Sequence, residues 1–160
     1  MGDLSEFPLH VRAFLRAYRW RRIEPLPWTP LRKPLNRARV ALVTSAGLTP
    51  PDALPYDPRI RGGDYTYRWI PDSVQLRLLV NNHRSESWDT SGFESDPNVV
   101  FPLDRLHELE RAGLIGETNR RHASFMGSIT APGRLIRHSA PEVAAELVGD
   151  QVDVAVLVPV

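Results

Sequence analysis

The sequence contains no cysteine among its 160 residues. Without a thiol, these residues cannot form a disulfide framework, a cysteine-based zinc site, an iron–sulfur cluster or a thiol nucleophile, so a redox role would need a group from outside them.

Long apolar runs are also missing. No stretch approaches the ~20 apolar residues of a membrane span, and the first residues lack the apolar centre of a secretory signal. We therefore expect a cytoplasmic protein that does not insert into a membrane.

Lysine is nearly absent, since 19 of the 20 basic residues are arginine. The net charge of +1 hides an uneven distribution. Residues 1–39 carry nine basic and three acidic side chains, a surplus of +6, whereas residues 40–160 carry eleven and sixteen, a deficit of −5. Guanidinium groups suit pairing with carboxylates or phosphates. We expect the basic arm to dock on its own domain or on a partner subunit rather than on nucleic acid or a membrane surface.

Length and an apolar content of 42% predict one globular domain with its own core. Residues 8–23 place apolar side chains at near-helical spacing with arginines between them, which predicts a basic amphipathic helix. A proline-rich stretch follows and excludes helix. We divide the chain into an arm over residues 1–36, packed on the body or on a partner, and an α/β domain over residues 37–160.

The body alternates strand and helix patterns. The middle of segment 39–46 and nearly all of segment 152–160 are apolar, which predicts strands buried on both faces of a parallel sheet. Further strands are expected at 65–70, 76–80 and 123–130, and helices at 102–112 and 141–148, each beginning at a proline and ending before a glycine.

This order predicts an α/β fold with a mostly parallel sheet flanked by helices, in a Rossmann- or flavodoxin-like arrangement of three layers. Ligands of such sheets bind beyond the carboxyl ends of the strands. The residues expected there are Thr44 to Gly47, Asn81 to His83, and Pro159 and Val160.

The common cofactor and hydrolase motifs are absent: there is no G-x-G-x-x-G, no Walker loop, no G-x-S-x-G and no H-E-x-x-H. His83, Asp89, Asp96 and His122 have side chains that bind metals, but their spacing is irregular and no pair lies four residues apart on a helix. We therefore predict no metal site.

Several polar residues are candidates for a site, each with an alternative structural role. The hydroxyls of Thr44 and Ser45 would bind a substrate carboxylate or cap the next turn. His83 and Asp89 would form a pair for proton transfer, in which the carboxylate fixes the tautomer of the ring. Asp96 is open between a catalytic role and an Asx turn, and for Asn98 the Asx turn is favoured over substrate binding.

Two further candidates are adjacent in the sequence. Arg121 and His122 would meet an anionic substrate or a partner's carbonyl group, or else form an ordinary surface ion pair.

Four segments together resemble a known family. They are RARVALVTSAG at 37–47, GDYTYRWIP at 63–71, SDPNVVFPLDRLHELERAGLIG at 95–116 and RHASFMGSI at 121–129. With HRSESWDTS at 83–91 and the terminal APEVAAELVGDQVDVAVLVPV, the chain resembles the selenoprotein B family of glycine, sarcosine and betaine reductases and D-proline reductase. The likeness runs from about Trp28 to Val160, and it raises His122 above the other histidines as a catalytic candidate.

The resemblance implies reductive cleavage of the carbon–nitrogen bond of an amino acid or N-methylated amino acid. A partner subunit, in several members through a pyruvoyl group, would hold the zwitterionic or amine substrate, and a selenolate would attack its α-carbon. In this family a selenocysteine, or a cysteine in its place, follows the terminal strand. In this chain the selenocysteine or cysteine is expected directly after Val160. The resemblance also implies a homo- or hetero-oligomer.

Because the sequence stops at that position, three interpretations stay open. The chain is the front part of a reductase subunit, with a UGA codon read as stop. It is a binding or assembly module that has lost the reductase centre. Or it is an enzyme without thiol or selenol, such as a lyase that acts on a small zwitterion through His83 and His122.

Overall fold

The computed structural model describes residues 4–18, 22–85 and 88–160 and divides into two compact units, Met1–Pro30 and Leu31–Val160. The first unit holds a 3-10 turn at Leu4–Glu6 and helix α1 at Leu9–Ala17. The predicted helix over 8–23 is therefore shorter, because Tyr18 is extended. Arg19, Trp20 and Arg21 lie outside the described residues. No helix in the described part of the chain is long and apolar enough to cross a bilayer.

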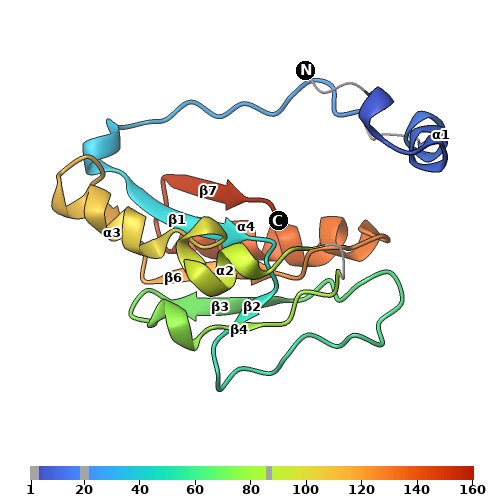
Figure 1. Ribbon diagram of the computed structural model, residues 1–160. Helices are drawn as coiled ribbons and strands as arrows, with labels where there is room; N and C mark the ends of the chain where they lie inside the picture. Colours follow the sequence, from blue (N-terminus) through green and yellow to red (C-terminus); the bar gives the residue numbers. More distant parts are fainter. Residues whose placement is uncertain (1–3, 19–21, 86–87) are drawn as a thin grey trace. The chain divides into compact units, whose positions relative to one another are not determined.

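The second unit is built on a mixed five-stranded sheet centred on β1 (Arg39–Thr44) (Figure 1). On one side β1 pairs in parallel with β7 (Val154–Val158), and on the other with β5 (Glu117–Thr118) and then β6 (Arg121–Phe125). The outer strand β3 (Tyr67–Pro71) is antiparallel to β6. The prediction of an α/β fold is confirmed. The sheet is mixed, since three of its four described pairings are parallel and the pairing of β3 with β6 is antiparallel, and the Rossmann- or flavodoxin-like arrangement stays a prediction.

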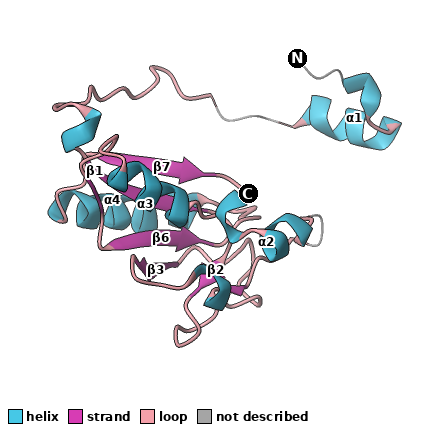
Figure 2. Ribbon diagram, turned by 60° about the vertical axis from the view of Figure 1, so that its left-hand side comes forward, coloured by secondary structure: helices cyan, strands magenta, loops and turns pink. Residues whose placement is uncertain are grey.

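Helices cover both faces of this sheet (Figure 2). Successive side chains of a strand point to opposite faces. Val40 and Leu42 therefore pack in one core cluster with Leu103 and Leu106 of α3 (Leu103–Arg111), while Ala41 packs in another with α4 (Ala140–Gly149). The helices predicted at 102–112 and 141–148 are confirmed.

The remaining elements are short. They comprise β2 (Leu48–Thr49), β4 (Val80–Asn81), α2 (Ser91–Ser95), a π-helical turn η5 (Leu135–Ser139) that leads into α4, and 3-10 turns η2 (Leu35–Arg37), η3 (Leu76–Leu78) and η4 (Pro97–Val99). The strand predicted at 76–80 is wrong over most of its length, since η3 occupies its first three residues. Leu76 and Leu79 are both buried, which matches the three-residue period of a 3-10 turn.

The terminal strand also differs from its prediction. β7 was expected to be buried on both faces, but it lies at the edge of the sheet and pairs only with β1 among the described strands. Leu157 is 71% exposed and Val156 is 38% exposed. An apolar sequence alone does not separate a central strand from an edge strand, because both pack at least one face.

Candidate functional site

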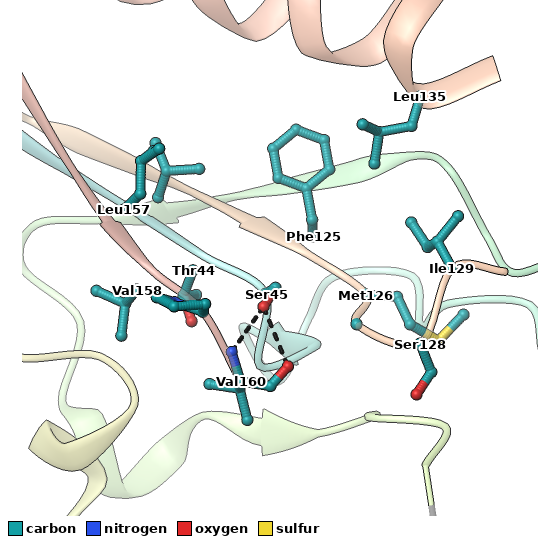
Figure 3. A pocket seen from close by; sticks show the side chains of 13 residues that line it. Thr44, Ser45, Phe125, Met126, Ser128, Ile129, Leu135, Leu157, Val158 and Val160 are labelled. Atoms are coloured by element: carbon teal, nitrogen blue, oxygen red, sulfur yellow. Dashed lines mark hydrogen bonds between the residues drawn. The ribbon is translucent and has the colours of Figure 1, made fainter. Parts of the chain in front are cut away.

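A crevice of ≈ 370 Å³ lies beyond the carboxyl ends of β1, β6 and β7 (Figure 3). This is the position at which α/β sheets bind ligands. Its lining is mostly apolar, and its polar residues are Thr44, Ser45 and Ser128. The other lining residues are Val43, Phe125, Met126, Gly127, Ile129, Leu135, Leu157, Val158, Pro159 and Val160.

Ser45 connects two strand ends at this crevice. Its hydroxyl accepts a hydrogen bond from the Val160 N–H at 2.9 Å and donates to the Val160 carbonyl at 3.4 Å (Figure 3). The hydroxyl of Thr44 is buried, donates to the Val100 carbonyl at 2.8 Å and accepts from the Ala46 N–H. Thr44 thus fills the capping role considered for it, and Ser45 holds the segment that follows β7.

His83 lies directly behind the crevice wall. The Asn82 N–H donates to the Gly47 carbonyl, and the Gly47 N–H donates to the Phe125 carbonyl at the end of β6. These bonds bring three segments of the chain together here. A Cβ on Gly127 would stand 2.2 Å from Nε2 of His83 and 2.7 Å from the Ser45 carbonyl oxygen. Only a glycine at 127 permits this approach.

The protonation of His83 follows from its contacts. Nδ1 accepts a hydrogen bond from the Ser85 N–H at 3.1 Å, so in the neutral ring the proton sits on Nε2. Nε2 is buried and has no hydrogen-bond partner among the described residues. Burial lowers the pKa of His83, because it disfavours the charged ring. The ring also meets Trp88 edge-on, with centroids 4.8 Å apart.

Asp89 is not the partner of His83. Its carboxylate accepts from the Ser91 N–H at the start of α2, a bond that lowers the pKa of Asp89. The paired arrangement expected for proton transfer is therefore wrong, because Asp89 caps a local turn instead.

His122 is completely buried in β6 and has both ring nitrogens engaged. Nδ1 accepts from the Leu42 N–H at 3.0 Å, and Nε2 lies 3.2 Å from Oδ1 of Asp72. His107 of α3 contacts the same oxygen at 2.8 Å. Burial raises the pKa of Asp72, but the bonds from His122 and His107 outweigh burial and leave it lowered. Along one edge, β1 pairs first with β5 and then with β6. Between these two pairings, the His122 ring accepts the hydrogen bond of the Leu42 N–H.

Arg121 lies at the amino end of β6, away from the strand ends that form the crevice. Its guanidinium bonds Asp150 at 2.7 Å and Glu146 at 2.8 Å and stacks 4.2 Å from the Trp69 ring centroid. The ion-pair alternative for Arg121 thus matches its geometry.

Asp96 and Asn98 form the predicted Asx turn, which is confirmed. Asp96 accepts from the Asn98 N–H at 3.0 Å, and Asn98 in turn accepts from the Asp104 N–H at the start of α3. Neither residue lines the crevice. In the part of the chain that the structure describes, no group of three or more histidine or acidic side chains is placed to hold a metal ion.

Sequence reasoning did not single out Asp72 or Ser128. Asp72 meets His122 because β3 runs antiparallel to β6 with Ile70 opposite His122, a register that no local pattern reveals. Ser128 has a φ of 55°, unusual for a residue other than glycine, at the turn where the chain leaves β6 for the crevice.

A family model described as glycine/sarcosine/betaine reductase selenoprotein B matches residues 9–160. The chain belongs to this family. The resemblance inferred from the sequence is thereby confirmed, with the match beginning earlier than Trp28. No solved structure matches the chain significantly.

Curated relatives of the family agree. The chain is 31% identical over 137 residues to the D-proline reductase subunit gamma of Acetoanaerobium sticklandii, covering 84% of this chain and 54% of the relative. It is 32% identical over 135 residues to the glycine reductase complex component B subunit gamma of Peptoclostridium acidaminophilum, with coverages of 78% and 28%. The sarcosine reductase complex component B subunit beta of that organism gives 31% over 134 residues, with 82% and 30%. The chain thus spans about half the length of the D-proline reductase subunit and less than a third of the length of the other two relatives.

Proposed function

We propose that this protein is a subunit of a cytoplasmic reductase complex that cleaves the carbon–nitrogen bond of an amino acid or N-methylated amino acid, with its reacting centre at the crevice. The supporting observation is the position of Val160. Val160 lines the crevice, and its N–H donates a hydrogen bond to the hydroxyl of Ser45 beside the carboxyl ends of β1 and β7.

We further propose that a selenocysteine or cysteine follows Val160 in the intact protein. Consecutive Cα atoms are ~3.8 Å apart, so a residue attached to Val160 begins beside the crevice whatever its conformation. A selenolate or thiolate there would attack the α-carbon of a substrate held by a pyruvoyl group on a partner subunit, forming a bond to carbon as the carbon–nitrogen bond breaks and the amine leaves. Thiols would then supply the two electrons that release the product and regenerate the nucleophile. The residues present fit such a group, since the crevice is mostly apolar with the serines Ser45 and Ser128, and none of its described lining residues is acidic.

The chain's own residues have defined tasks in this proposal. Ser45 fixes the backbone of Val160 and so orients whatever follows it. The bond from Ser45 to the Val160 carbonyl is long, so the hydroxyl can turn to a substrate carboxylate instead. The apolar walls, Phe125 and Leu135 among them, would contact the apolar part of a bound substrate.

The experiment is a comparison of two serine variants in the intact complex. The tagged protein is purified without oxygen together with its partner subunits, and reductive cleavage of the carbon–nitrogen bond is measured. The readout is ammonia or amine released from glycine, sarcosine and betaine, and the ring-opened 5-aminopentanoate formed from D-proline. We expect Ser45→Ala to lower turnover by about tenfold, because the segment after β7 loses its fixed orientation. Ser73→Ala, an exposed serine after β3, serves as the control. Equal turnover in both variants, or no carbon–nitrogen bond cleavage with any of the four substrates, would count against the proposal.

A further inference from the structure

A second hollow, of ≈ 620 Å³, lies between the turn before β3 and the start of the helix that leads into α4. We call it the arginine pocket because Arg61, Arg134 and Arg137 line it together with Tyr65. None of its lining residues is acidic. Its volume is within the range of small-molecule sites.

The three guanidinium groups have no acidic partner among the residues that the structure describes. Among the ion pairs of residues 4–18, 22–85 and 88–160, none involves Arg61, Arg134 or Arg137. The acidic residue nearest in sequence, Asp64, is buried and directs its oxygens to the Asp57 N–H and to Thr66. Like charges gathered without a counter-charge attract an anion from solution.

The walls of the pocket are fixed by backbone geometry. Gly62 and Gly63 have φ values of 84° and 101°, and a Cβ on Gly62 would stand 2.4 Å from Cβ of Ala131. The Ala131 N–H donates to the Gly62 carbonyl at 3.1 Å. This double glycine turn therefore closes against the segment that carries Arg134.

Two of the arginines lie close to other groups of the pocket wall. The guanidinium of Arg134 lies 5.4 Å from the centroid of the Tyr65 ring, a cation–π distance. That of Arg137 lies over Gly133, where a Cβ would be 3.3 Å from Nη1. Arg134 is also the N-cap of η5, which runs on into α4, so the positive end of the helix dipole adds to the field.

We propose that the arginine pocket binds a multiply charged small anion, a phosphate ester or a polycarboxylate. Planar guanidinium forks match the oxygens of both groups. The hollow is wider than a bare phosphate needs, which leaves room for an organic remainder. This inference goes beyond the proposed reductase role and does not rest on it.

The test is isothermal titration calorimetry of the full chain with pyrophosphate and with citrate, at constant ionic strength. Tighter binding of pyrophosphate identifies a phosphate site, and tighter binding of citrate a polycarboxylate site. We expect Arg134→Gln and Arg137→Gln each to weaken the preferred anion about tenfold. Both side chains are exposed, so folding is expected to persist, and circular dichroism checks it.

Arg111→Gln is the matched control. Arg111 is an exposed arginine of α3 whose side chain bonds only the His107 carbonyl in the described structure. The control is expected to bind like the unaltered protein. Absence of binding at millimolar anion, or an equal loss of affinity in all three variants, would overturn the proposal.

Discussion

Gly127 is the residue at which the crevice depends most sharply on the absence of a side chain. We expect Gly127→Ala to lower the free energy of unfolding by about 2 kcal/mol, because the new methyl group collides with the His83 ring and with a backbone oxygen that has little room to move. Urea denaturation measures the effect.

Gly149→Ala is the matched control for this change. A Cβ there meets no atom within 4 Å, and Gly149 ends a helix, so alanine is expected to be neutral or to stabilise by up to about 1 kcal/mol. If both variants have the same stability, the close packing of His83 behind Gly127 is wrong.

Asp72 gives the protein a stability that depends on pH. Its pKa in the folded state lies below the ordinary value of 3.8, so the unfolded chain binds the proton more readily. The stabilisation is therefore complete at pH values above 3.8, the pKa of the unfolded state. It is lost as the pH falls below 3.8 toward the lowered pKa of the folded state. Asp72→Asn is expected to cost about 1 kcal/mol near pH 6 and progressively less toward pH 3, since the side chain is partly exposed.

Denaturation at several pH values checks this prediction, with the exposed Asp52→Asn as control. A loss of stability in Asp72→Asn that is the same at every pH would show that the His107 and His122 contacts do not depend on its charge.

At the scale of elements, α4 covers one face of the sheet through a narrow stripe of side chains. Leu147 is 6% exposed and packs with Ala41 and Ala123, whereas its neighbour Val148 is 73% exposed. We expect Leu147→Ala to cost about 3 kcal/mol and Val148→Ala less than about 0.5 kcal/mol in urea denaturation. Similar costs for both would mean that α4 docks by a different face.

Element types were more predictable than strand partners. Prolines and glycines mark the ends of α3 and α4, and the apolar run of β1 follows from burial on both faces. The edge position of β7 could not be predicted, because its residues are as apolar as those of β1. The same applies to β3, whose antiparallel pairing with β6 is set by tertiary packing rather than by local pattern.

The candidate site shows the same division. The topology rule for parallel strands correctly placed Ser45 and Val160 together, since it depends only on strand direction. Residue type alone gave poorer guidance: Asp89, Asp96 and Asn98 serve turns, and Arg121 serves an ion-pair cluster. His122 matches the family pattern, yet both its nitrogens hold the sheet together. Its catalytic role stays a prediction.

At the scale of the whole molecule, the central claim is that the segment after β7 carries the reactive group of a reductase subunit. The most direct test is intact-mass and tandem mass spectrometry of the protein isolated from its native source after alkylation. The account predicts one alkylated selenocysteine, with the isotope pattern of selenium, or one alkylated cysteine, directly after Val160. A native polypeptide that ends at Val160, or that continues with neither residue, would contradict it.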